Sequence, residues 1–451
     1  MPSTHRRGAR FKFNLNRARC IDRFDRHQRL RHRRGFDRGR GTVGVKALKA
    51  SRRGADEPVM AAHAHRLFDR PVRSAVEVFT FAVVPAVVLG LFAISLVHAA
   101  RSGVIGGHGE LSFDFEANLL RAGRDVLAGR SPYHLDELQR VVAAQRAGHP
   151  FAEFATPNYP APGLLLGVPF ALLPRSAACI VGTVLLLLAT PLALRLYGVR
   201  DWRCYGVALL AAPVLSGLAA GNLTALLVLL AAVAWRYRDR AFICALAIAA
   251  AISLKLFLWP LVIWLLVTGR ARTAALSLGL SAAMIVIGFA IVGPSELLAY
   301  PHLVSLLEEA TSQRGLSVAA TAHWLGASHE LGTVVSIALG GMLVMLMLDA
   351  ARRRRSDVAA HGYAIAAALA FSPVIWDHYL SFVLIVVCLR APSLGPLWGA
   401  LLVAYYLVPT NQTPAPHWWA AVGPITILAL AAIASDLSPI TRAGPVRFGS
   451  G

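Results

Sequence analysis

Charged residues are scarce in this sequence, and the motifs of nucleotide-binding proteins are missing from it. Only 15% of the 451 residues are Asp, Glu, Lys or Arg, whereas a soluble domain has about 25%. The chain contains neither a Walker-type phosphate-binding loop nor a GxGxxG sequence after a strand. These gaps argue against an ATP-driven pump and against an enzyme with a Rossmann-like nucleotide-sugar domain.

Cysteine is also rare, and its five positions form no pattern. None belongs to a CxxC pair or to a large polar loop, so we predict neither a disulfide framework nor a zinc site. A cleavable signal peptide is not expected, because the first apolar run begins late and is long. The cysteines are Cys20, Cys179, Cys204, Cys244 and Cys388.

Apolar residues dominate instead. The chain is 56% hydrophobic with a mean hydropathy of +0.56. Alanine, leucine and valine supply this apolarity in continuous runs, whereas a transmembrane β-barrel would need short alternating segments. We therefore predict an all-α polytopic membrane protein. The runs are 75–98, 162–174, 177–197, 204–219, 222–235, 241–254, 256–268, 274–292, 331–348, 359–374, 378–390, 397–409 and 418–434.

Basic residues cluster between these runs and predict a topology. If the short, proline-bounded run 162–174 does not cross, about twelve crossings remain. Both termini and every arginine cluster are then cytoplasmic. The polar segments between the other run ends lie on the outer face, among them a large first loop, 100–161. The clusters are Arg200 with Arg203, Arg236 to Arg240, Arg270 with Arg272, Arg352 to Arg355, and Arg442 with Arg447.

The net charge of +21 comes largely from the N-terminal segment, because eighteen of the 45 Lys and Arg residues lie within Met1–Glu57. We predict a basic, disordered cytoplasmic tail over 1–73, a multispan domain over 74–435, and a cytoplasmic C-terminal tail over 436–451. There are two alternatives for the tail. It binds anionic lipid or nucleic acid, or translation begins at Met60, after the basic segment. We expect no nucleic-acid partner.

The most informative polar stretch is Leu111–Pro162, inside the first outer loop. Unpaired polar groups in hydrocarbon cost several kcal/mol each, so this stretch lies in water, where loops tend to carry function. Asp114 stands between two phenylalanines at its start. Two roles fit this carboxylate: a general base, or the N-cap of a helix over Ala117–Leu127.

Three further motifs carry polar side chains next to apolar runs. Lys255 suits an anionic ligand such as a phosphate, or it is a lysine that snorkels to water. The run Trp376-Asp377-His378-Tyr379 suits a sugar or phosphate site, or an interfacial aromatic belt. In Gly221-Asn222 the amide can bind a hydroxyl, although helix packing explains the glycine equally well.

The order of these motifs along the chain is itself informative. It runs Asp114-Phe115, Leu127 to Tyr133, Tyr159 to Pro162, Gly221-Asn222, Lys255 and Ser372 to His378. This ordered set, over roughly residues 75–435, resembles glycosyltransferase family 87. Members of that family are bacterial, multispan α-(1→2)-mannosyltransferases of the GT-C class that use a polyprenyl-phosphate-mannose donor.

The resemblance implies a GT-C-type helical fold in the cell membrane, with the active site on the extracytoplasmic face. It implies transfer from the polyprenyl-phosphate donor to a glycolipid or lipid-linked glycan, with Asp114 as the base. Lys255 and His378 would then lie near the donor phosphate or the acceptor. In-line displacement would invert the anomeric carbon, and we expect neither a metal nor a cofactor. The remaining candidate binding residues are Asp377, Trp376, Asn222, Tyr159 and Arg121.

Rival functions remain open at this point. A polyprenyl-phosphate-arabinose-dependent arabinofuranosyltransferase has much of the same motif order. A transporter or flippase of lipid-linked sugars predicts internal repeats and polar residues near the bilayer midplane. No repeat is evident, and the predicted polar residues gather at one face. A non-catalytic scaffold would not need the polar residues at Lys255 and Asp377-His378.

Overall fold

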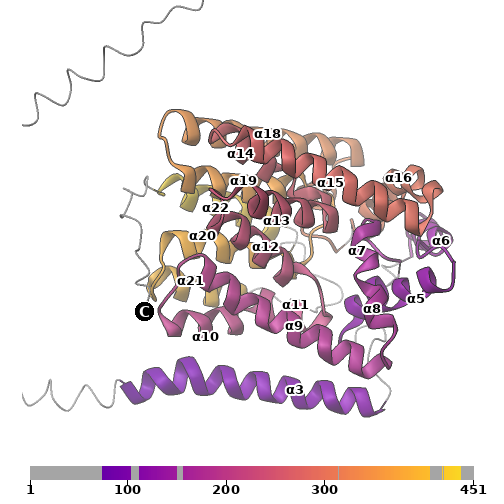
Figure 1. Cartoon of the computed structure of the whole chain (residues 1–451), viewed down its shortest axis with the longest axis horizontal. Coiled ribbons are helices and arrows are strands. Elements are labelled where there is room, and N and C mark those ends of the chain that lie inside the picture. Colours follow the sequence, from indigo (N-terminus) through magenta and orange to yellow (C-terminus); the bar gives the residue numbers. More distant parts are fainter. Residues whose placement is uncertain are drawn as a thin grey trace, which may run out of the picture. The chain divides into compact units, whose positions relative to one another are not determined.

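The computed structural model describes residues 74–102, 111–149, 156–312, 314–406, 419 and 421–437, which all belong to the unit Phe68–Gly451. The predicted N-terminal tail and most of the predicted C-terminal tail lie outside the described residues. The described residues form helices and no strand (Figure 1). The chain is therefore an all-α protein, as its continuous apolar runs predict.

Most helices coincide with the predicted apolar runs. In chain order they are η1 (Phe79–Val83), α3 (Val84–Ser102), α4 (Phe113–Phe115), η2 (Glu116–Arg121), α5 (Ala122–Leu127), α6 (Leu135–Arg146), α7 (Ala161–Leu165), α8 (Gly167–Ala171), α9 (Arg175–Leu196), α10 (Trp202–Leu210), α11 (Ala212–Ala220), α12 (Thr224–Arg236), α13 (Ala241–Leu254), η3 (Leu256–Leu258), α14 (Pro260–Val267), α15 (Ala271–Val292), α16 (Pro294–Thr311), α17 (Val318–Trp324), α18 (His329–Arg352), α19 (Asp357–Phe371), η4 (Asp377–Phe382), α20 (Val383–Arg390), α21 (Pro396–Tyr406) and α22 (Val422–Ser435).

Several of these helices can cross a membrane, which makes the chain a multi-pass membrane protein. By length and composition, four described helices qualify: Ser74–Ala99, α9, α15 and α18. The pair α10 and α11, bent by 62°, makes a fifth if it forms one span. This number is smaller than the twelve crossings expected from hydropathy, because many apolar runs form helices of only 10–17 residues.

The short run 162–174 forms α7 and α8, and neither is among the helices long enough to cross. The two helices pack against the outer-loop helices instead. A Cβ at Gly167 would lie 1.9 Å from the backbone oxygen of Leu119, so η2 and α8 are in backbone contact. A side chain at position 167 would therefore separate these helices.

The described residues 111–149 of the predicted first loop form helices that are attached to the rest of the unit. Asp125 is buried and accepts hydrogen bonds from the Arg130 guanidinium at 2.7 and 3.1 Å. At the end of α6, Arg146 forms a two-pronged ion pair with Glu309 on α16, at 2.6 and 2.7 Å. Figure 1 shows α5, α6 and α16 together at one end of the unit. The loop is thus a folded part of the domain.

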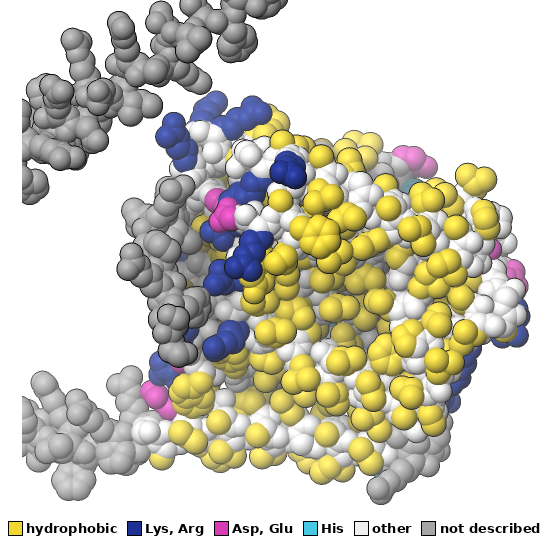
Figure 2. All heavy atoms as spheres, viewed as in Figure 1, with side chains coloured by type: hydrophobic (Ala, Val, Ile, Leu, Met, Phe, Trp, Pro, Cys, Tyr) yellow, Lys and Arg dark blue, Asp and Glu magenta, His cyan; other side chains and the backbone are white. Residues whose placement is uncertain are grey.

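The opposite end of the helices carries arginines. Arg238, after α12, and Arg270, before α15, both contact the carboxylate of Asp357 at the start of α19, at 3.0 and 2.9 Å. Figure 2 shows many Lys and Arg side chains along the left edge of the molecule and a few at the opposite edge. Because α12 and α14 finish at this end, their other ends lie near Asn222 and Lys255. The arginines and the candidate site residues therefore lie at opposite helix ends, as the sequence predicts.

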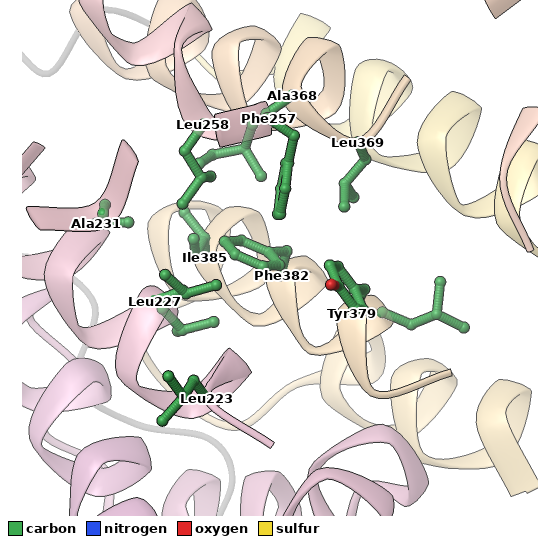
Figure 3. Close-up of a cluster of buried hydrophobic side chains, with 14 of the residues drawn as sticks. Leu223, Leu227, Ala231, Phe257, Leu258, Ala368, Leu369, Tyr379, Phe382 and Ile385 are labelled. Atoms are coloured by element: carbon green, nitrogen blue, oxygen red, sulfur yellow. The ribbon is translucent and has the colours of Figure 1, made fainter. Parts of the chain in front are cut away.

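Alanine-rich helices form the interior. Every residue of α19 from Val358 to Ala370 is buried, and small alanines allow neighbouring helices to approach closely. Larger rings fill the space next to these alanines: Phe257 packs against Tyr379 and Phe382, and Figure 3 shows these rings together with Leu227 beside Phe382. On the outside, apolar side chains cover the face in Figure 2, which suits contact with lipid.

Candidate active site

Asp114 lies in the first turn of α4, where the described part of the outer loop begins. Ser112 takes the N-cap position of this helix, with a φ of 63°, so the helix-cap interpretation of Asp114 does not describe the structure. The Oδ2 atom of Asp114 accepts a hydrogen bond from Nδ2 of Asn222 at 2.7 Å. Its Oδ1 accepts none from the described residues, which leaves this oxygen available to a substrate hydroxyl.

A tight turn after α11 brings Asn222 to this carboxylate. Gly221 has a φ of 70°, and a Cβ there would lie 2.7 Å from the Cβ of Phe115. The glycine therefore serves both the left-handed turn and a close approach to α4. Oδ1 of Asn222 accepts from the N–H and the hydroxyl of Thr224, at 3.0 and 2.7 Å. These two bonds orient the amide so that its NH₂ group faces Asp114.

Lys255 follows α13 in an extended conformation, and its side chain is only 7% exposed. Nζ donates to Oδ1 of Asn158 at 2.7 Å. It also lies 4.2 Å from the ring centroid of Tyr159 and 5.5 Å from that of Tyr379. A snorkelling lysine would extend its ammonium to water. This one is instead enclosed by an amide and two aromatic rings, which favours the ligand-binding interpretation.

The groups in contact with the ammonium are neutral. Burial raises the pKa of the Tyr159 phenol well above its ordinary value, and nearby Tyr379 and Asp114 add to the effect. The Tyr159 backbone oxygen accepts from the Tyr133 hydroxyl at 3.0 Å, which fixes this segment. Lys255 forms no ion pair with any described residue. A buried cation with neutral neighbours is suited to an anionic ligand.

Asp377 and His378 begin η4 and pack against α11. Oδ2 of Asp377 accepts from the hydroxyl of Ser216 at 2.5 Å, while Oδ1 accepts from the backbone N–H of His378 at 2.9 Å. Oδ1 also lies 3.5 Å from Nδ1 of the His378 ring. Nε2 of His378 is buried without a hydrogen-bond partner in the described part of the chain. Since buried ring nitrogens normally have a partner, this atom can receive a ligand group.

Helix α11 and Tyr379 connect these groups into one site. The middle of α11 carries Ser216, which binds Asp377, and its end leads to Asn222, which binds Asp114. Tyr379 follows His378, and its ring faces the Lys255 ammonium. In Figure 3, Tyr379 belongs to a cluster of buried hydrophobic side chains that includes Phe257 and Phe382. No metal-binding group of three or more His, Cys, Asp or Glu occurs among the described residues.

Arg121 lies away from the charged groups of the site, whereas Trp376 directly precedes Asp377. The guanidinium of Arg121 lies 3.9 Å from Glu137 on α6, and the side chain is partly exposed. It makes no contact with the Asp114 or Lys255 groups among the described residues. Trp376 is half-buried just before η4, where its backbone oxygen accepts from the Tyr379 N–H at 3.0 Å. Its backbone therefore shapes the turn that places His378.

Sequence reasoning missed three polar residues that support the site: Asn118, Asn158 and Ser216. Asn158 accepts from Lys255, and its own N–H donates to Oδ1 of Asn118 at 2.9 Å. A signal was present, because Asn118 and Ser216 each interrupt an apolar stretch and Asn158 directly precedes Tyr159. None of the three is ionisable, however, and a single neutral residue does not stand out against ordinary helix polarity.

Comparison with known proteins adds a family assignment. Residues 158–375 match the model of glycosyltransferase family 87. The matched region includes Tyr159, Asn222 and Lys255. Asp114 lies 44 residues before its start, and Asp377-His378 follow shortly after its end. No curated protein and no solved structure matches the chain significantly.

Proposed function

We propose, from the premise that this chain belongs to glycosyltransferase family 87, that it transfers mannose from a polyprenyl-phosphate donor to a hydroxyl group of a glycolipid or lipid-linked glycan. The coarser conclusion, a membrane glycosyltransferase, follows from the family and the membrane-spanning helices. One observation supports the finer proposal most directly. A carboxylate and a buried ammonium share one end of the helices without forming an ion pair with each other.

The buried cation suits the donor. A phosphate diester places negative charge beside the anomeric carbon, and this charge increases on the leaving oxygen as the glycosidic bond breaks. Lys255 supplies a positive charge whose close contacts are all neutral. His378, with Nε2 unpartnered, is a second donor for a phosphate oxygen or a sugar hydroxyl. Both groups favour the transition state if their contact with phosphate strengthens as charge develops.

The carboxylate suits the acceptor. Oδ1 of Asp114 takes the proton of the acceptor hydroxyl while that oxygen forms a bond to the anomeric carbon. The bond from the anomeric carbon to the phosphate oxygen breaks at the same time, and polyprenyl phosphate leaves. Attack opposite the leaving group inverts the anomeric configuration. Asn222 holds Oδ2 throughout, so Oδ1 keeps a fixed direction.

The position of the site supports extracytoplasmic transfer. Arg238 and Arg270 lie at the other end of the helices. Basic residues between membrane spans are enriched on the cytoplasmic side of a membrane. The Asp114 end then faces outward, where the polar head of a lipid-linked donor and a glycolipid acceptor can both reach it. Membrane lipids surround the apolar faces between the two ends.

The direct test is incubation of membranes containing the protein with radiolabelled polyprenyl-phosphate mannose and extracted envelope glycolipids. We expect label in a lipid-extractable product in which the new linkage is α. Polyprenyl-phosphate arabinose is supplied in a parallel reaction, because the arabinofuranosyltransferase alternative predicts transfer only from that donor. Absence of transfer from either donor by correctly inserted protein would refute the proposed function.

A further inference from the structure

Asn158 occupies a central place between the two charged residues of the site. Oδ1 accepts from the Lys255 ammonium at 2.7 Å, and its backbone N–H donates to Oδ1 of Asn118 at 2.9 Å. Its backbone oxygen lies 3.4 Å from the hydroxyl of Tyr300, which donates to it. Asn118 follows Asp114 by four residues on continuous helix, α4 into η2. A continuous set of bonds therefore links the helix of Asp114 to the ammonium.

We propose that Asn158 is a positioning residue for Lys255. This proposal rests on the proposed function, because it assumes an anionic donor. Asn158 holds the ammonium at a fixed place relative to Asp114, and it does so with a neutral acceptor. The charge of the lysine therefore stays available for the donor phosphate. Asn118 anchors Asn158 to the helix that carries the base.

The need for positioning follows from the chemistry of lysine. Its ammonium sits on a flexible four-carbon stem, so the charge has no fixed place without a partner. The rings of Tyr159 and Tyr379 attract the cation but define only a broad position. The hydrogen bond from Nζ to Asn158 supplies direction. Because the stem and the rings are buried, this bond selects where the charge points.

The neutrality of the acceptor is equally important. A carboxylate at position 158 would accept the same hydrogen bond with nearly the same shape. It would also form a close ion pair with Lys255, and a donor phosphate would then have to compete with it. An asparagine provides the geometry without this competition. The substitution Asn158→Asp therefore distinguishes two roles of Asn158. It keeps a hydrogen bond that only supports the structure, but it interferes with the binding of an anion by Lys255.

The experiment compares purified wild type, Asn158→Asp and the control Gln139→Glu in the mannose-transfer assay, with the donor concentration varied. Gln139 is exposed on α6 and receives the same change from amide to carboxylate. We expect the donor KM of Asn158→Asp to rise by roughly tenfold or more. We expect kcat to fall as well, because the paired Lys255 no longer stabilises the charge that develops on the leaving phosphate. Gln139→Glu should keep both constants.

A wild-type donor KM in folded Asn158→Asp would overturn the positioning role while leaving the proposed function intact, because a purely structural hydrogen bond survives this substitution. If Asn158→Asp does not fold, Asn118→Ala decides the question, since it releases the backbone of Asn158 without adding charge. The donor KM of Asn118→Ala should also rise, and an unchanged value would refute the anchor. If wild type transfers no sugar from any polyprenyl phosphate, the proposed function itself is wrong.

Discussion

Replacing Asp114 with asparagine removes the proposed base and leaves the local structure in place. The amide oxygen of asparagine can still accept from Nδ2 of Asn222, which is 2.7 Å from Oδ2 in the wild type. Since Ser112 takes the N-cap position of α4, the substitution removes no cap. The change in folding stability should therefore be small, and the main loss should be proton acceptance.

The expected loss of activity follows from the role of a base. General-base catalysis contributes about 10²- to 10⁴-fold in rate, or roughly 3 to 5 kcal/mol of barrier. We expect kcat of Asp114→Asn to fall by at least the lower of these factors. Donor binding should persist, because Lys255 and His378 are unchanged.

The assay measures mannose transfer in single-turnover conditions, with binding of the radiolabelled donor to purified protein measured separately. Glu116→Gln is the matched control, because Glu116 lies on the same helical segment but pairs with Arg175 at 3.2 Å. This control loses the same charge and should retain transfer. If Asp114→Asn transfers mannose within about tenfold of the wild type, the general-base assignment is wrong.

Three further outcomes are expected. Lys255→Ala should weaken donor binding in the same binding assay without abolishing slow transfer at saturating donor, because it removes the cation and not the base; unchanged donor affinity would contradict the phosphate role. Gly221→Ala should lower both thermal stability and transfer, because a left-handed residue costs about 1–2 kcal/mol and its Cβ would lie 2.7 Å from Phe115. The control Gly129→Ala, at a φ of 67° in open space, should lower thermal stability alone. Equal effects of the two substitutions on transfer would refute the role of close approach. A membrane-impermeant thiol reagent should label His302→Cys but not Arg353→Cys in intact cells, because the predicted topology places only position 302 outside. The test needs a background with Cys20 replaced, since both positions are exposed and the other four native cysteines are buried. Labelling of position 353 from outside would contradict the predicted topology.

The helices could be predicted well from the sequence because the signal for them is local. The runs 241–254 and 256–268 break at Lys255, and the structure ends α13 at Leu254 and resumes at Leu256. The predicted apolar runs leave 293–330 without a helix, but residues 294–311 form α16. Hydropathy missed this helix because its polar residues serve contacts with the outer loop, such as Glu309 with Arg146. Pro294 at its first turn was an available signal.

The contacts of the candidate site could not be predicted in the same way. Asn222 and Asp114 are 108 residues apart, and Lys255 and Asn158 are 97 apart. The basic and polar residues between the apolar runs predict at which end of the helices a residue lies. They do not predict which side chain it contacts there. Arg121 illustrates the limit, because it lies at the expected end and yet pairs with Glu137.

Asparagine side chains make the arrangement of charges at this site possible. A carboxylate and an ammonium in the same poorly hydrated region attract each other strongly, and an ion pair between them would occupy both. Asp114 instead receives its hydrogen bond from Asn222, and Lys255 gives its own to Asn158. Each charge is thus held by a neutral amide. Thr224 binds the side chain of Asn222, and Asn118 binds the backbone N–H of Asn158. Because neither charge is consumed by the other, the proposed base stays free to accept a proton and the cation stays free to bind the proposed donor phosphate.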